Sequence, residues 1–353
     1  MKTLTVALPG RDYDILIERG LLSQAGALCK AALPRARRLA LVTDASVGPL
    51  YAGRVKASLE EAGFAVQVTT LPAGEHTKCA ESLSLLWETF MSFGLTRTDA
   101  VVALGGGVIG DLAGFAAATV LRGVDFVQIP TTLLAQVDSS VGGKVAIDLK
   151  AGKNLAGAFW QPKLVLMDPD VLNTLDDKTF SDGMAEVIKY GCIRDAGFFS
   201  FLEQRPSRRG IMEEIEHVLY TCCDIKREVV VEDERDTGVR MLLNFGHTLG
   251  HAYELAGNYE TWTHGQAVAA GMVKAAELGH TLGVTPAGIS QRIAALLGCF
   301  GLPISLSCTH DQYAAAVGLD KKGAGNDISL ILLESMGRAI PRKMPKAEVL
   351  DLL

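Results

Sequence analysis

The chain has 353 residues, of which 48% are hydrophobic, 21% charged and 6% aromatic. This composition is typical of a well-packed globular protein with one large or two modest domains. Its 34 Lys and Arg residues stand against 40 Asp and Glu, a net charge of −6, which gives no sign of the basic surface that nucleic acids and anionic membranes require, so we expect neither as a partner.

Membrane spans and disulfides are also not expected. The longest nearly uncharged stretches, 100–110 and 112–121, are interrupted by Asp111 and closed by Arg122, whereas a spanning helix needs about 20 apolar residues. The first residues show no signal-peptide pattern, so we expect a cytoplasmic protein. The seven cysteines include no C-x-x-C pair, which argues against a disulfide framework and a thiolate zinc site.

The first half of the chain alternates short strand patterns with helical ones. An opening pair of strands, 4–8 and 15–18, brackets Pro9-Gly10 and predicts a hairpin at a sheet edge. Strands are then expected at 39–43, 64–71, 100–104 and 125–130, and helices at 48–62 and 79–93. Such alternation indicates a Rossmann-like α/β domain with a parallel sheet, which we assign to residues 1–180.

The second half is predicted to be mostly α-helical. A last strand at 164–167 is followed by Asp168-Pro169-Asp170. Apolar residues then recur at helical spacing in 186–190, 211–229, 248–255 and 267–282. We therefore expect a helical domain over residues 181–353.

A glycine-rich turn follows the strand at 100–104. The segment Gly105-Gly106-Gly107-Val108-Ile109-Gly110-Asp111 contains G-x-G-x-x-G, a pattern that lets backbone N–H groups approach a pyrophosphate at a helix start. Two strand–helix units precede it and Asp111 directly follows the last glycine, unlike a standard Rossmann motif. A tight turn without ligand is the alternative. The loop 72–78 carries Glu75 and Lys78 after a strand end, where an open α/β sheet binds its ligand. The alternative is a solvated loop without a ligand.

Histidines provide candidate metal ligands. His247 and His251 are four residues apart, on one face of a predicted helix, and His264 and Glu186 lie elsewhere in the helical half. One carboxylate with two or three imidazoles makes an open, zinc-type site. Thr248 replaces the glutamate of the H-E-x-x-H pattern. Spacing alone does not decide which imidazoles bind, and ordinary surface or core histidines are the alternative.

Cationic residues cluster near these motifs although the chain is acidic. They are Arg122, Lys144, Lys153, Lys189, Lys226, Arg240, Lys321 and Lys322. Together they indicate a small anionic substrate that carries phosphate and carboxylate, although surface solvation explains any one of them. The segment 131–144 adds hydroxyls, Asp138, two glycines and Lys144 after a strand, as expected of a binding loop.

With these motifs in order along its length, the chain resembles the 3-dehydroquinate synthase family of the sugar phosphate cyclases. The matching segments are 72–78, 105–111, 130–144, 152–154, 185–191, 243–252, 264–265 and 320–322. The resemblance implies that Glu186, His247 and His264 hold a divalent ion, zinc or cobalt, and that His251 contacts substrate or phosphate. It also implies an active site in a cleft between the domains, and a homodimer in which Arg122 reaches across.

Two further sets of residues follow from the resemblance. Those implied for NAD are Asp44, Ala73, Gly74, Glu75, His76, Thr77, Lys78, Gly107, Val108, Ile109, Gly110, Asp111, Thr131, Thr132, Lys144, Lys153, Val171, Leu172, Asn173 and Thr174. Those implied for catalysis or substrate binding are Arg122, Asp138, Lys144, Lys153, Asn154, Lys189, Lys226, Arg240, Asn244, His251 and one of Lys321 and Lys322.

The activity implied is conversion of 3-deoxy-D-arabino-heptulosonate 7-phosphate into 3-dehydroquinate and phosphate, in the shikimate pathway, with NAD regenerated in each turnover. A related sugar phosphate cyclase, a metal-dependent polyol dehydrogenase and a non-catalytic NAD-binding sensor are the alternatives. Two positions depart from the family pattern: Gln266 stands where glutamate is usual, and Val120 replaces a commonly aromatic residue. The first bears on tuning of the metal site and the second on packing.

Overall fold

The computed structural model describes residues 1–353 except Thr237, Tyr259 and 320–325. The chain divides into two compact units. The first comprises 1–175 together with 226–231, and the second comprises 176–225 together with 232–353. Residues 226–231, which belong to the first unit, are part of helix α8 (Ile215–Glu232). The two continuous domains predicted from the sequence, 1–180 and 181–353, place these residues in the second domain instead. None of the helices described could cross a membrane.

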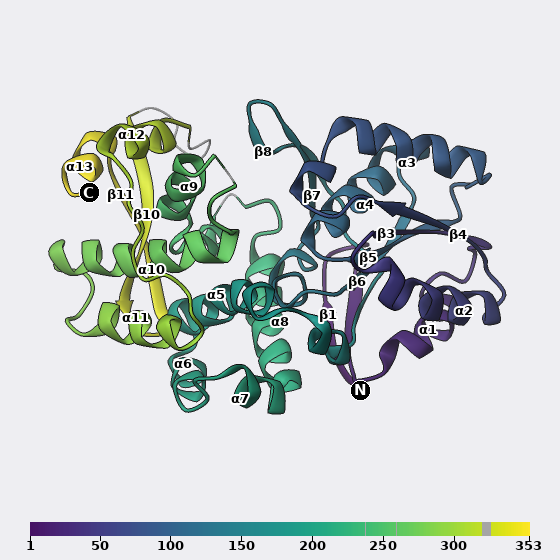
Figure 1. The fold of residues 1–353 in the computed structure, drawn as a ribbon, viewed down its shortest axis with the longest axis horizontal. Coiled ribbons are helices and arrows are strands. Elements are labelled where there is room, and N and C mark those ends of the chain that lie inside the picture. Colours follow the sequence, from purple (N-terminus) through teal and green to yellow (C-terminus); the bar gives the residue numbers. More distant parts are fainter. Residues whose placement is uncertain (237, 259, 320–325) are drawn as a thin grey trace. The chain divides into compact units, whose positions relative to one another are not determined.

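The first unit contains a seven-stranded sheet in the order β1-β2-β9-β6-β5-β3-β4; β1, β3, β4, β5 and β6 are labelled in Figure 1. Its strands are β1 (Lys2–Val6), β2 (Tyr13–Ile17), β3 (Arg38–Asp44), β4 (Ala65–Leu71), β5 (Ala100–Gly105), β6 (Asp125–Pro130) and β9 (Leu164–Met167). Every neighbouring pair is parallel except β1 and β2. The predicted parallel sheet and the antiparallel hairpin at its edge are therefore confirmed.

Helices cover the sheet as its burial pattern requires. The helices of this unit are α1 (Ala25–Ala32), α2 (Gly53–Glu61), α3 (Ala80–Ser92) and α4 (Gly107–Thr119). Strand β5 is buried along its whole length, as in a parallel strand with both faces covered. The alternate residues Ala40, Val42, Val101 and Ala103 share a core cluster with apolar side chains of α3 and α4. A separate hairpin, β7 (Lys144–Leu149) and β8 (Gly152–Phe159), contributes Val145 to the same cluster.

The second unit is mostly helical, as predicted. Besides most of α8 it holds α5 (Asp177–Arg194), α6 (Ala196–Glu203), α7 (Arg208–Glu213), α9 (His247–Ala256), α10 (His264–Thr281), α11 (Ile289–Cys299), α12 (His310–Leu319) and α13 (Lys346–Asp351). It also contains an antiparallel hairpin, β10 (Asp327–Ser335) and β11 (Arg338–Pro345), beside α10 (Figure 1). This hairpin was not predicted from the sequence, although Ile328, Leu330 and Leu332 alternate inward along β10.

Candidate metal and nucleotide sites

The candidate nucleotide-binding segments of the first unit follow the carboxyl ends of parallel strands. Gly105 at the end of β5 lies opposite Pro130 at the end of β6, and the N–H of Thr131 donates to the carbonyl of Gly105 (2.9 Å). The two predicted loops are thereby joined at this edge of the sheet. The hydroxyl of Thr131 is buried there, and no described residue is its hydrogen-bond partner. An open α/β sheet binds its ligand at this edge.

Close packing of α4 requires glycine at several positions of the turn. A Cβ added at Gly105 would lie 2.7 Å from a side-chain carbon of Ile109, and one at Gly110 would lie 2.8 Å from Oε1 of Gln128. The N-cap residue Gly106 has no side chain to bind the first N–H groups of the helix. Those groups are what an anion at a helix start uses. The turn therefore suits a pyrophosphate. Close packing would require these glycines even if no ligand bound.

Lys78 is the centre of a buried polar network beside that turn. Its ammonium donates to Oδ2 of Asp111 (2.5 Å) and also to Oδ1 of Asn154. Asp148 completes the network, because its N–H donates to the carbonyl of Lys78 and its Oδ1 accepts from the N–H of Asn154, both at 2.8 Å. Burial alone would lower the pKa of Lys78, but Asp111 raises that pKa above its ordinary value. Lys78 therefore keeps its charge.

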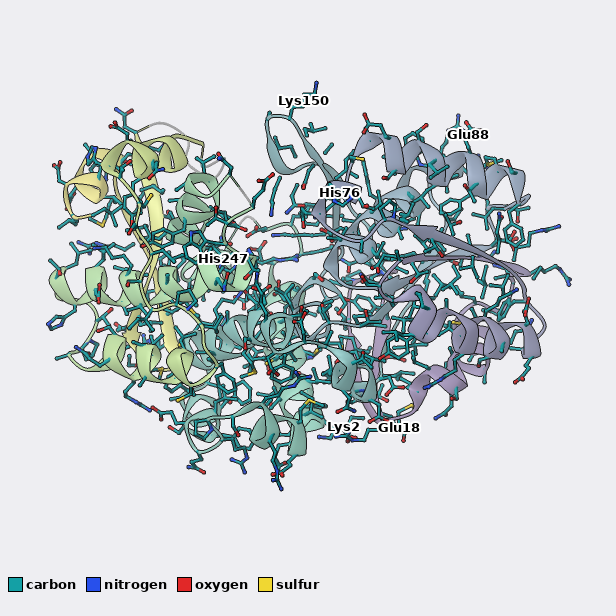
Figure 2. The ribbon with its side chains drawn as sticks, in the orientation of Figure 1. Lys2, Glu18, His76, Glu88, Lys150 and His247 are labelled. Atoms are coloured by element: carbon teal, nitrogen blue, oxygen red, sulfur yellow. The ribbon has the colours of Figure 1, made fainter. Side chains whose placement is uncertain are left out.

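A second ion pair joins two other predicted residues of this unit. The ammonium of Lys226 donates to Oδ1 of Asp138 (2.8 Å) and to its carbonyl oxygen. Lys153 lies 4.0 Å from Oε1 of Glu75, a carboxyl whose pKa is raised by burial. His76, labelled in Figure 2, lies in the same loop as Glu75.

Further predicted residues of this unit lie in turns and at the ends of helices and strands. Asp44 accepts hydrogen bonds from the N–H groups of Ser46 and Val47 and so closes its own turn. Arg122 is exposed, with a left-handed φ of 69°. Lys144 is exposed at the start of β7. The residues Val171, Leu172, Asn173 and Thr174 form a short helical turn.

In the second unit, three helices bring together one carboxylate and two imidazoles. Glu186 comes from α5, His247 from the start of α9 (Figure 2) and His264 from the start of α10. Oε1 of Glu186 lies 3.5 Å from Nε2 of His247 and 3.7 Å from Nε2 of His264. Of all described residues, these form the only group with the ligand types and spacing to hold a metal ion.

Glycines allow the three helices to approach each other at this point. A Cβ on Gly271 of α10 would lie 2.1 Å from the carbonyl oxygen of Gly246, just before α9. A Cβ on Gly265 would lie equally close to the carbonyl oxygen of Asp182 on α5. Gly246 also adopts a left-handed φ of 80°, which glycine accepts at low cost. The resulting backbone contacts bring the ligand atoms of Glu186, His247 and His264 within 4.8 Å of one another.

The second nitrogen of each imidazole faces an acceptor. Nδ1 of His247 lies 3.2 Å from the carbonyl of Phe245, and Nδ1 of His264 lies 3.4 Å from Oε1 of Glu254. A carbonyl oxygen only accepts hydrogen bonds, so Nδ1 of His247 carries the proton and its Nε2 is left as the possible metal ligand. His264 lies between two carboxylates, Glu254 at Nδ1 and Glu186 at Nε2; an ion bound at Nε2 would replace a proton there and leave Nδ1 to donate to Glu254. This is the arrangement of metal-binding histidines with outer hydrogen-bond partners, and the residues fit a divalent ion.

Charges around the three ligands differ for the two histidines. Burial, with the nearby ammonium of Lys189, lowers the pKa of His247 to about 3. For His264, burial acts in the same direction, but hydrogen bonds and charges from Glu186 and Glu254 raise the pKa well above its ordinary value. A cation at this point would compete with a proton for Nε2 of His264. The ammonium of Lys189 contacts the other oxygen of Glu186.

The remaining predicted residues of this unit lie around the group of three. His251 is 60% exposed and is not one of the three, with its Nε2 3.9 Å from Oε2 of Glu254. Arg240 is buried and donates to the carbonyl of Glu234 (2.6 Å), and Asn244 ends the helical turn Val239–Asn244. Lys321 and Lys322 lie outside the described residues.

Sequence reasoning overlooked two carboxylates beside the metal candidates. Glu254 is seven residues after His247 and Asp182 is four before Glu186, so helical spacing could have placed each on the same face as a ligand. Oδ1 of Asp182 accepts from the N–H of Gly265 (2.7 Å). Gln266, the departure from the family pattern, accepts from the N–H of Thr263 in a capping box. Its acceptor oxygen therefore serves the start of α10.

Sugar phosphate cyclases are among the solved structures similar to this chain over nearly its whole length. A 2-deoxy-scyllo-inosose synthase matches with a TM-score of 0.89 at 24% identity, covering 99% of each chain. The 2-epi-5-epi-valiolone synthase from Streptomyces hygroscopicus subsp. jinggangensis, solved with NAD+ and Zn2+ bound, matches with a TM-score of 0.87 at 27% identity, covering 96% of this chain and 95% of that one. The fold is therefore that of the sugar phosphate cyclases.

Sequence comparison narrows the class. The family model for the 3-dehydroquinate synthase N-terminal region matches residues 68–182, and that for the C-terminal region matches 183–323. A 3-dehydroquinate synthase from Clostridium beijerinckii is 47% identical over 344 residues, which cover 97% of this chain and 98% of that protein. The chain belongs to the 3-dehydroquinate synthase family.

Proposed function

We propose that the protein is a 3-dehydroquinate synthase, a lyase that converts 3-deoxy-D-arabino-heptulosonate 7-phosphate into 3-dehydroquinate and phosphate. The observation that carries the proposal is the 47% identity, over nearly its whole length, to a relative of that name. The three converging ligand side chains and the glycine turn support it, because the reaction needs a divalent ion and NAD.

The ion would be held by Glu186, His247 and His264, and the dinucleotide by the glycine turn with Thr131 and the loop that carries Lys78. Together the bound groups would supply Lewis acidity toward substrate hydroxyls and a reversible hydride acceptor. The relative with 27% identity is solved with NAD+ and Zn2+. The 2-deoxy-scyllo-inosose synthase is solved with NAD+ and Co2+. Zinc or cobalt is therefore the ion we expect here.

Residues of the second unit have defined tasks in this proposal. His247 and His264 keep Nδ1 protonated against Phe245 and Glu254 and so direct Nε2 toward Glu186. Lys189 is buried beside Glu186 and places a positive charge where a substrate oxygen acquires negative charge. Arg240, held by the carbonyl of Glu234, offers a guanidinium that suits a carboxylate.

Residues of the first unit hold cations in defined positions. Asp138 fixes the ammonium of Lys226, and Asp111 fixes that of Lys78, so neither side chain must be ordered when an anion binds. The buried hydroxyl of Thr131 and the N–H groups at the start of α4 offer hydrogen bonds to a dinucleotide phosphate. Holding the substrate in one conformer then favours the intramolecular closing step.

The test is incubation with the heptulosonate phosphate, catalytic NAD and zinc, while phosphate and product are followed. We expect one phosphate released per 3-dehydroquinate formed, with no net NADH. Steady NADH accumulation would indicate a polyol dehydrogenase, and turnover of another sugar phosphate alone would indicate a related cyclase. No phosphate release from any of them would indicate an NAD-binding sensor. The homodimer, the role of Arg122 across it and the cytoplasmic location remain predictions, to be checked by light scattering and fractionation.

A further inference from the structure

Glu254 is a buried carboxylate next to the metal candidates. Its side chain is only 4% exposed on α9, where a charged group is costly unless it is hydrogen-bonded. One carboxylate oxygen lies 3.4 Å from Nδ1 of His264, and the other lies 3.9 Å from Nε2 of His251. The carboxylate therefore lies between a predicted metal ligand and a predicted substrate contact.

We propose that Glu254 is a positioning residue that holds the His264 ring with Nδ1 protonated and Nε2 directed at the metal position, and so raises the affinity for the divalent ion. The proposal rests on the metal assignment made in the proposed function. A carboxylate that accepts from a ligating histidine fixes its tautomer and orientation and increases its basicity.

The positions of the two histidines explain why only His264 needs this carboxylate. His247 follows the Gly246 turn, and the carbonyl of Phe245 in that turn accepts from its Nδ1. His264 is the first residue of α10, so its ring projects from a helix end toward α9. Glu254 supplies from α9 the acceptor that His247 finds in its own backbone.

The start of α10 is fixed separately from the ring. Thr263 accepts from the N–H of Gln266, and Asp182 accepts from the N–H of Gly265. These bonds locate the backbone at His264 but leave rotation of its side chain open. Side-chain contacts orient the ring: Glu254 faces Nδ1, and Glu186 faces Nε2. Ring orientation is therefore a property separable from folding of the helix.

The experiment compares Glu254→Gln and Glu254→Leu with the unaltered full-length protein. Zinc affinity is measured by competition with a chromogenic chelator, and the cobalt-loaded protein is examined by visible absorption. We expect affinity to fall about 10- to 100-fold in Glu254→Leu. Glu254→Gln, which retains an acceptor oxygen but not its charge, should fall between this variant and the unaltered protein. The cobalt spectrum should shift in both, because the imidazole contributes to the ligand field.

Glu277→Gln is the matched control, since Glu277 is exposed on α10 and its substitution changes charge equally. Affinity within twofold of the unaltered protein in both Glu254 variants would overturn the proposal, as would an equal loss in the control. Loss of affinity that only parallels loss of helical circular dichroism would also overturn it. If Glu254→Leu does not fold, the Gln variant decides alone.

Failure of the proposed function gives a different pattern. Zinc that binds the unaltered protein but not Glu186→Gln establishes the metal position without turnover, so the Glu254 proposal survives even if the heptulosonate phosphate is not converted. Zinc that binds Glu186→Gln with unchanged affinity refutes the metal assignment, and the role of Glu254 with it.

Discussion

The two candidate sites are built from opposite kinds of contact. In the first unit, cations are paired with carboxylates, as Lys78 is with Asp111 and Lys226 with Asp138. In the second, two imidazole nitrogens and a carboxylate oxygen converge from three helices. Ion pairs fix ammonium groups in advance for an anion, whereas converging lone pairs form the coordination shell of a cation. The first unit is therefore suited to an anionic ligand, and the three converging side chains of the second unit are suited to a metal cation.

Removal of the one carboxylate among the three ligands tests this contrast most severely. Glu186→Gln should lower zinc affinity by more than the roughly 100-fold at the upper end for an outer-shell partner. Activity should fall with it, because an amide is a poor metal ligand and Lys189 loses its charged neighbour. NAD binding, which we assign to the first unit, should remain. Normal activity after chelation and zinc repletion would contradict the assignment.

A variant of Lys189 tests whether the positive charge beside Glu186 contributes to turnover independently of metal binding. Lys189→Met preserves most of the side-chain volume and should reduce kcat about 100-fold, within the range for loss of one preorganised electrostatic group. Zinc content should not fall, since the ammonium is not a ligand and its removal takes a positive charge away from the cation. Metal analysis and steady-state kinetics on the same preparation check this. A fully active variant removes Lys189 from the site.

The ion pair of the first unit should affect stability more than metal affinity. Lys78→Met leaves Asp111 without its charged partner in a mostly buried position, and breaking such a pair costs about 3 kcal/mol. Denaturant unfolding should show this loss, and NAD affinity should fall while zinc affinity does not. The control Lys56→Met breaks the exposed pair with Glu60 and should cost about 0.5 kcal/mol or less. Equal losses would show that the Lys78 network contributes no more than a surface pair.

The same contrast explains what the sequence could predict. Strand patterns and the glycine turn are local, so the parallel sheet, its edge hairpin and the loops at its carboxyl edge follow from residue order. The metal group joins α5, α9 and α10 through tertiary packing, and spacing alone left His247, His251 and His264 equivalent; the family resemblance separated them. The hairpin β10–β11 was missed because it interrupts a run of helices. Glu254 was missed because no motif marks a carboxylate that acts through a histidine.

The smallest expected effect is that of removing a helix N-cap. It should differ between a cap next to a metal ligand and a cap far from any candidate ligand. Thr263 caps α10 directly before His264, and Ser207 caps α7 by the same kind of bond, to the N–H of Gly210. Thr263→Ala and Ser207→Ala should each cost about 1 kcal/mol of unfolding free energy. Only Thr263→Ala should also weaken zinc binding, by a few-fold, because the first turn of α10 then loses its side-chain cap and the backbone at His264 is held only by the bonds to Asp182 and Gln266. Unfolding and chelator competition measured on both variants test this. Equal zinc affinity would show that the bonds to Asp182 and Gln266 suffice to place His264.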